Sequence, residues 1–489
     1  MTRVTSRFVS SILPRTHMRE TAIKWFTFSL VAFAVWAFTI SRAIPLRNGD
    51  RGVFVSMAER LAAGDVLYVD IWDNKEPLFF WTLSLGRLVS PGMDVVIELT
   101  WIVLSALAAF AIARTAGASN FLAAASGFIA APLVIVGYTY AAGFSHLPAT
   151  CVFLGLTAAV LRQRWLIAGV LLPVLGLYKI ITVPMGLAVI IVGLVYLRKG
   201  KAPLHTGFGV IISGAFLTGL LAIRGELIGF LELIWSNIGY SQKPLSDAYD
   251  LPLWSHIEPV MVPGSVIVVA ATAATVLATQ SARNSSARIL RLMTAWSLGA
   301  SIGITAITGL WEHHAQIFTG PAVLGAALIG AALQDSPFKW TSALGLVLLA
   351  GVILSGGLSA RQVVDSALSA PTRWDDLFRV SQAARDVQDL GTGLSYMRLG
   401  SNTDDSHAYG LRDYDFACYQ FVQYYYDIPS TLEYIPTCLP EADVVIVDDS
   451  LAIRSGAPEW NSFVEASESV LTSDFTCRPT EYGRLCIRR

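Results

Sequence analysis

Residues 165–197 read WLIAGVLLPVLGLYKIITVPMGLAVIIVGLVYL, a run that decides how the chain is threaded. It is uncharged apart from Lys179, and its 33 residues are too many for one straight membrane helix, which needs about 20. Basic clusters at 162–164 and 198–201 flank it, and such clusters collect in the cytoplasmic loops of membrane proteins. We therefore predict a helical hairpin that crosses twice and turns near Tyr178 and Lys179.

Nine further apolar segments have the length and composition of membrane helices. They centre on 24–41, 95–113, 119–137, 146–161, 204–223, 261–279, 292–310, 315–333 and 340–358. The first follows a basic region and lacks a clean cleavage site, so we interpret it as a retained helix. With the hairpin, the sequence predicts eleven crossings. The basic residues Arg114, 283–291 and Lys339 then all lie inside.

Composition excludes a soluble protein. The 489 residues are 54% hydrophobic and 15% charged, against roughly 25% charged in a soluble domain. The net charge of −1 and the lack of a basic stripe argue against nucleic acid as a partner. Long apolar runs fill residues 1–358, whereas 359–489 have the mixed composition of a small soluble α/β domain, so we predict two domains.

The positions of the cysteines indicate on which side of the membrane the second domain lies. Cys418, Cys438, Cys477 and Cys486 fall in it, while Cys151 is alone in a predicted helix. An even set is typical of two disulfides in an extracytoplasmic domain, with three possible connectivities. The spacing favours a Cys477–Cys486 pair, and four reduced thiols are the alternative. Eleven crossings from an inner N-terminus also put this domain outside the plasma membrane.

The first long outer loop, 42–94, contains DRGVFVSMAERLAAGDVLYVDIWDNKEPLFFW at 50–81. Asp50 opens a helix whose apolar stripe includes Val53, Phe54, Met57, Ala58 and Leu61, and Gly64 ends it. A second helix begins at Pro77, because Pro suits the first helical turn. We expect both helices to lie along the membrane surface.

This loop resembles the GT-C glycosyltransferase superfamily, whose members take a sugar from a polyprenyl-phosphate carrier. The resemblance is carried by an acid just after the first membrane helix, then by AERLAAGDVLYVD (58–70) and WDNKEP (72–77). It extends more weakly to three further segments, AGVLLPVLGLYKIITVP (168–184), LWEHHAQIFTGPAVLGAAL (310–328) and LPEADVVIVDDS (439–450). Arg51 stands where many relatives have a second acid, and Glu76 stands in a basic-Pro-Pro element.

The resemblance implies a GT-C-like fold and a hexosyl- or pentosyltransferase of the cell envelope, with no cofactor. Its acceptor would be an extracytoplasmic glycan, lipid or protein. It gives Asp50 the role of general base, which a single inverting displacement requires. Substrate contacts, including those to the departing phosphate, fall to Asp73, Lys75, Lys179, His313 and His314. We expect no metal, because adjacent histidines point apart.

Each role has a structural alternative. Asp50 is also a common helix cap, and Lys75 could reach lipid headgroups. A charge at Lys179, within an apolar stretch, is costly and usually functional. His146 has the character of an interfacial belt residue. A retaining double displacement, which needs a nucleophile as well, also stays open, because Asp73 and Glu76 are close by in the sequence.

Two other functions compete with transfer. A transporter or lipid flippase is the first alternative, but such proteins usually contain repeated halves and charges near the midplane, which this sequence lacks. An interaction or sensory protein is the second, and it would leave Asp50, Lys75 and Lys179 without a shared purpose.

The predicted topology can be tested with reporter fusions at residue 200 and at the C-terminal domain. We expect the reporter at residue 200 to be active in the cytoplasm. The reporter on the C-terminal domain should be active outside the membrane. A cytoplasmic signal from the C-terminal domain would show that the number of crossings is even.

Overall fold

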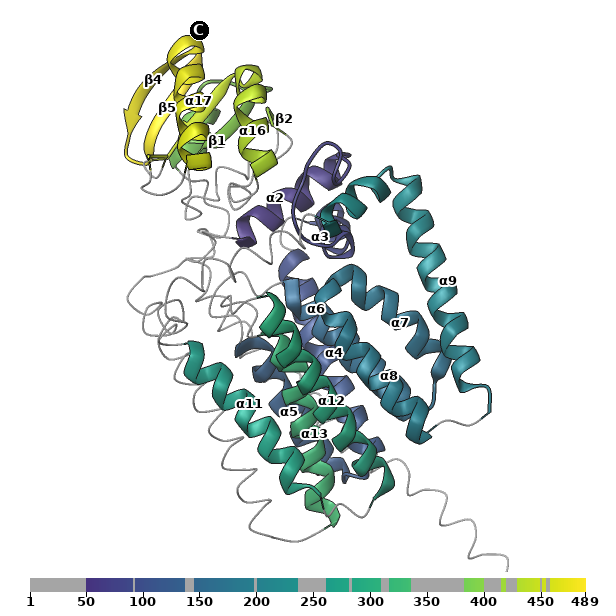
Figure 1. Cartoon of the computed structure of the whole chain (residues 1–489). Helices are drawn as coiled ribbons and strands as arrows, with labels where there is room; N and C mark the ends of the chain where they lie inside the picture. The colour runs from purple at the N-terminus through teal and green to yellow at the C-terminus, as the bar shows by residue number, and fades with distance from the viewer. Residues whose placement is uncertain are drawn as a thin grey trace, which may run out of the picture.

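The computed structural model describes twelve stretches of the chain, which form a helical bundle and a small sheet domain (Figure 1). The described residues are 50–90, 93–136, 145–197, 200–235, 261–280, 284–308, 316–335, 382–399, 415–418, 429–448, 451–453 and 458–489. The predicted domain boundary at 358 lies outside them.

The bundle is built from apolar helices. They are α2 (Asp50–Ala63), α3 (Pro77–Val89), α4 (Met93–Thr115), α5 (Asn120–Val136), α6 (His146–Leu161), α7 (Trp165–Tyr178), η3 (Ile180–Thr182), α8 (Val183–Leu197), α9 (Ala202–Ile223), α11 (Met261–Ala278), α12 (Ser285–Thr308) and α13 (Thr319–Asp335).

Five helices among the described residues are long and apolar enough to cross a membrane, which indicates a membrane protein. They cover Val96–Thr115, Ile180–Leu197, Ala202–Ile223, Ser285–Ala306 and Gln316–Leu333. The other predicted segments between 95 and 333 are shorter apolar helices here. The segments 24–41 and 340–358 lie outside the described residues, so the count of eleven crossings stays a prediction.

The stretch at 165–197 breaks where its length and flanking charges predict. The first helix, α7, ends at Tyr178, and Lys179 adopts an extended backbone with φ −165° and ψ 100°. The single turn η3 follows, and α8 then carries the chain to Leu197. The predicted pair of helices with its turn at 178–179 is therefore confirmed.

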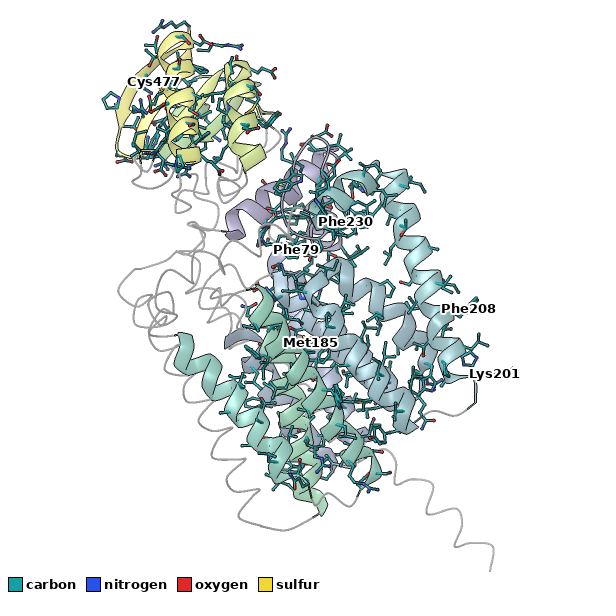
Figure 2. All side chains as sticks on the ribbon, in the orientation of Figure 1. Phe79, Met185, Lys201, Phe208, Phe230 and Cys477 are labelled. Carbon is teal, nitrogen blue, oxygen red and sulfur yellow. A yellow bond between two sulfur atoms is a disulfide. The ribbon has the colours of Figure 1, made fainter. Side chains whose placement is uncertain are left out.

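Basic residues gather at one end of the bundle. Arg162 Nε donates a hydrogen bond of 3.4 Å to Thr115 Oγ1, which joins the turn after α6 to the end of α4. Lys201 precedes α9 at this end, whereas Phe79 and Phe230 lie at the opposite end (Figure 2). We call the end with Arg162 and Lys201 the basic end. Which side of a membrane it faces stays a prediction.

Helices α7 and α9 cross with their backbones almost in contact. A Cβ atom built on Gly169 would lie 2.2 Å from the carbonyl oxygen of Thr206. One built on Gly209 would lie 2.4 Å from that of Leu166. Small residues allow such close approach, and van der Waals packing of this kind holds helices together in lipid. The outer face of α9, with Phe208, points away from the bundle (Figure 2).

The C-terminal domain is a five-stranded sheet in the order β2-β1-β3-β5-β4. Its strands are β1 (Ser395–Leu399), β2 (Asp415–Phe416), β3 (Val444–Val447), β4 (Phe475–Thr480) and β5 (Gly483–Arg488), and its helices are α15 (Gln382–Gln388), α16 (Pro429–Cys438), η8 (Leu439–Glu441) and α17 (Pro458–Asp474). Strands β2, β1 and β3 are parallel, while β5 runs antiparallel to both neighbours. All four residues of β3 are buried, as the apolar run in LPEADVVIVDDS predicts.

Two disulfides close this domain. Cys477 bonds Cys486 across the antiparallel pair β4–β5, and Cys418 bonds Cys438 at the end of α16. Cys151 in α6 is a free thiol. The prediction of two disulfides is thus confirmed, and one of the three connectivities is selected. Figure 2 shows Cys477 within the sheet domain.

The α7–α9 crossing predicts that replacing glycine by alanine has different effects on the free energy of unfolding at two positions of α9. Gly209→Ala should lower the free energy of unfolding by about 1–3 kcal/mol, because the new methyl group meets a backbone oxygen that cannot move aside. Gly214→Ala on the same helix adds a methyl group to open space and should be neutral or stabilising by up to about 1 kcal/mol. Thermal unfolding of both purified variants measures the difference. Equal shifts would contradict the close crossing.

Candidate functional site

Helix α2 begins and ends where the sequence predicts. It starts at Asp50 and stops before Gly64, whose φ of +119° suits glycine. Its buried stripe includes Phe54, Met57 and Ala58. The side chains of Asp50 and Val53 lie outside the description, so the choice between base and helix cap at Asp50 remains a prediction.

Helix α3 is packed into the end of the bundle opposite the basic end. Pro77 starts it, and the Phe54 ring of α2 lies 5.1 Å from the Phe79 ring and 5.9 Å from the Phe80 ring. On the far side, the Thr82 and Tyr178 hydroxyls are 2.9 Å apart, which joins α3 to the end of α7. Because α3 contacts α2, α4 and α7, it fixes the loop before it relative to the bundle. Whether α2 and α3 lie along a membrane surface stays a prediction.

Glu76 joins the first loop to the break between α7 and α8. Its Oε1 accepts a hydrogen bond of 2.8 Å from the backbone N–H of Ile180, and its Oε2 lies 3.8 Å from Lys179 Nζ. Both side chains are nearly buried, with exposed fractions of 4% for Glu76 and 10% for Lys179. The structure therefore neutralises Lys179 with a carboxylate 103 positions earlier in the sequence. Glu76 thus makes one hydrogen bond and one charge contact, and the retaining displacement that would use it as a nucleophile stays an alternative.

Asp73 and Lys75 form a tight turn beside that pair. Asp73 Oδ1 accepts a hydrogen bond of 2.9 Å from the Lys75 backbone N–H, and the Asp73 side chain is fully buried. Lys75 Nζ donates to Asn74 Oδ1 at 2.5 Å and lies 5.6 Å from the centre of the Phe54 ring. Since Lys75 is 8% exposed and turned inward, its burial argues against a role in reaching lipid headgroups.

Tyr68 stabilises this turn by a hydrogen bond to its backbone. It adopts a left-handed backbone with φ 65°, a strained conformation for a bulky residue, and its hydroxyl donates a hydrogen bond of 2.7 Å to the Lys75 carbonyl. A Cβ on Gly229 would lie 2.3 Å from Tyr68 Cβ, so glycine is required there. Burial, followed by the charges of Glu76, Asp73 and Glu226, raises the pKa of Tyr68. The hydroxyl thus stays protonated as a donor.

Glu226, just beyond α9, anchors the loop from the other side. Its carboxylate accepts hydrogen bonds from Trp81 Nε1 at 2.9 Å and from Arg224 Nε at 2.7 Å. Arg224 also lies over the Trp81 ring, 5.4 Å from its centre. Burial raises the pKa of Glu226, against the opposing hydrogen bond and charge of Arg224. Sequence reasoning missed Glu226, because nothing near it in the chain marks it as a partner of the first loop.

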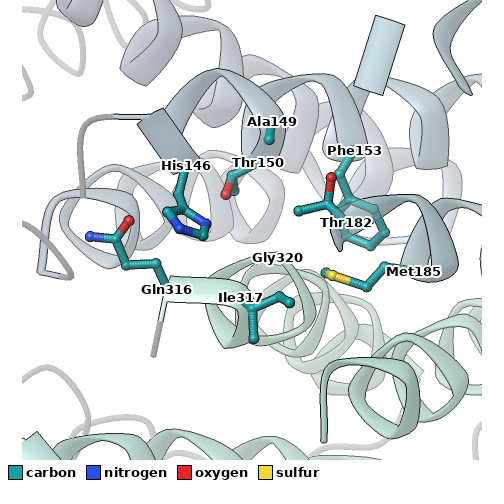
Figure 3. A pocket seen from close by; sticks show the side chains of 9 residues that line it. All are labelled: His146, Ala149, Thr150, Phe153, Thr182, Met185, Gln316, Ile317 and Gly320. Atoms are coloured by element: carbon teal, nitrogen blue, oxygen red, sulfur yellow. The ribbon is translucent and has the colours of Figure 1, made fainter. Parts of the chain in front are cut away.

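A small cavity of about 10 Å³, room for roughly one water, lies beside the break after α7 (Figure 3). Polar lining comes from His146, Thr150, Thr182 and Gln316, and Thr182 also donates a hydrogen bond of 2.6 Å to the Lys179 carbonyl. His146 is 2% exposed, so its interpretation as a belt residue at the lipid interface is wrong. It packs inside the bundle at the first residue of α6.

The remaining predicted residues are His313 and His314, which lie outside the described residues. Within the described part of the chain, His, Cys, Asp and Glu nowhere gather as three or more in positions that could hold a metal ion. Comparison with known proteins adds no assignment, since no protein-family model matches the chain and no curated protein is significantly similar to it.

The Glu76–Lys179 pair predicts a strong coupling energy. Lys179→Met should cost about 3–5 kcal/mol of stability, because it leaves a carboxylate buried without its cation. Adding Glu76→Gln should recover part of that loss. A double-mutant cycle on thermal or denaturant unfolding measures the coupling.

The matched control is the exposed pair Arg484–Glu468, whose side chains are 37% and 36% exposed. Its coupling should stay below about 1 kcal/mol. Additive effects at Glu76 and Lys179 would show that the two charges do not interact.

Proposed function

We propose that the protein is a membrane glycosyltransferase that moves a sugar from a polyprenyl-phosphate donor to a glycan, glycolipid or protein acceptor. The observation that carries the proposal is the convergence of Asp73, Lys75, Glu76 and Lys179 at the end of the bundle opposite the basic end. Buried charges are costly within apolar helices and usually serve a function. These four come from the loop that resembles GT-C enzymes and from the break at Lys179.

Asp50 belongs to the same region through α2. It lies one helical turn before Phe54, whose ring lies 5.6 Å from Lys75 Nζ. A base on α2 and cations at 75 and 179 then lie on neighbouring elements. This arrangement supports the roles that the resemblance implies for Asp50, Lys75 and Lys179.

The proposed reaction is one displacement. The acceptor oxygen bonds to the anomeric carbon, its proton passes to the Asp50 carboxylate, and the bond from that carbon to the phosphate oxygen breaks. Polyprenyl phosphate leaves with the bonding electron pair, and Lys75 and Lys179 stabilise its charge. Attack from the face opposite the leaving group inverts the anomeric centre. His313 and His314 are proposed as further donors to the substrate.

The reaction is proposed to occur outside the plasma membrane. The two disulfides support this side, because disulfides persist in oxidising compartments. Arg162 and Lys201, in short loops at the other end of the bundle, favour the same side, because short basic loops collect in the cytoplasm. Figure 1 shows the sheet domain at the end of the bundle where α2 and α3 lie.

Asp50→Asn tests the proposal. We expect the purified variant to lose about 10²–10⁴-fold of its transfer rate with donor binding largely kept, since an amide cannot accept the acceptor's proton. Analysis of envelope glycans and glycolipids in a strain lacking the protein identifies the sugar to assay. Lys75→Gln and Lys179→Gln should weaken donor binding, turnover or both.

Asp70→Asn is the matched control. Asp70 is an exposed acid of the same loop, and its Oδ2 accepts a hydrogen bond from the Val66 backbone that an amide oxygen can also accept. Its transfer rate should be close to wild type. A near-wild-type rate for Asp50→Asn would favour a helix cap, because Asn caps nearly as well as Asp. Unchanged glycans in the deletion strain would favour a transporter or flippase instead.

A further inference from the structure

A groove of about 380 Å³ opens between α11 and α12 at the basic end of the bundle. Its walls are apolar on both sides, formed by Val276, Leu292 and Ala295. Two polar side chains interrupt them, Gln280 just after α11 and Arg291 on α12. Arg291 lies six residues into α12, about 9 Å along the axis from its first residue. The groove therefore combines an apolar part, formed by Val276, Leu292 and Ala295, with a cation and an amide.

Arg291 has no counter-charge within the part of the chain that the structure describes. Among the described residues it makes no ion pair and no side-chain hydrogen bond, although it is half-buried. No Asp or Glu occurs between Glu258 and Glu312, whereas that interval contains three arginines. A half-buried guanidinium with five donors favours a planar or tetrahedral oxyanion that accepts several hydrogen bonds. The anion must therefore come from outside this part of the chain.

We propose that the groove binds one anionic phospholipid, with its phosphate on Arg291 and Gln280 and an acyl chain along Val276, Leu292 and Ala295. A lipid fits better than free phosphate because three of the five lining residues are apolar, and an acyl chain gains about 0.8 kcal/mol for each buried methylene. Arg291 lies near the start of α12, at the end of the bundle that the predicted threading places at the inner surface, where anionic lipids meet basic residues of membrane proteins. This inference does not depend on the proposed transfer reaction.

Native mass spectrometry of the purified full-length protein tests the proposal. The protein is delipidated and then offered phosphatidylglycerol or phosphatidylcholine with the same acyl chains. We expect at least tenfold preferential retention of phosphatidylglycerol by the wild type and loss of that preference in Arg291→Gln. Ala295→Trp, which keeps the charge but fills the apolar wall, should reduce retention of phosphatidylglycerol as well.

The matched control is Arg164→Gln, which removes the same charge from an exposed arginine at the same end, between α6 and α7. It should retain phosphatidylglycerol like the wild type. Thermal unfolding midpoints within a few degrees of wild type show that each variant is folded.

Four results would overturn the proposal. One is equal retention of the two lipids by the wild type, and another is unchanged preference in Arg291→Gln. The third is displacement of the lipid by millimolar inorganic phosphate, which would make the site a simple anion site. A disulfide between cysteines placed at Ala295 and within 340–358 would likewise show that another segment of the chain covers the groove.

Discussion

At one end of the bundle, a single carboxylate joins the start of α3 to the break between α7 and α8. Helix α7 stops at Tyr178, and Ile180 begins a new turn. The Ile180 N–H therefore lacks the helical hydrogen bond to the carbonyl four residues earlier. Glu76 supplies the acceptor, and it is placed to do so because it directly precedes the helix that starts at Pro77. The same carboxylate neutralises Lys179. The first loop and the central hairpin are therefore joined through this one side chain.

Features with a local cause were predictable from the sequence. Gly64 ends α2 because glycine accepts a positive φ, and Pro77 starts α3 because proline needs no amide partner there. The break at Lys179 followed from the length of the apolar run and the charges on both sides. The buried strand β3 followed from an uninterrupted run of β-branched residues. In each case the deciding chemistry lies within a few positions of the feature.

The contacts that close the candidate site could not be predicted, because they join residues far apart in the sequence. Trp81 and Glu226 are separated by 145 positions, and neither residue belongs to a pattern that points to the other. The left-handed Tyr68 is stabilised by its surroundings, including a glycine on a distant helix, and no local signal marks it. Lys179 was singled out as a costly charge, but its partner was found only in three dimensions. His146 is the opposite case. A histidine at a helix end is typical of a membrane interface, but packing in three dimensions buries this one.

The strand order of the C-terminal sheet has a consequence for biogenesis. Strand β5 lies between β3 and β4, yet it follows both in the sequence. At roughly 5–20 residues per second, the ribosome makes β3 about two to eight seconds before β5 is complete. During that interval, one edge of the apolar strand Val444–Val447 has no neighbour to bond. The sheet can therefore be completed only after β5 has been made, and until then the open edge of β3 is able to pair with other chains.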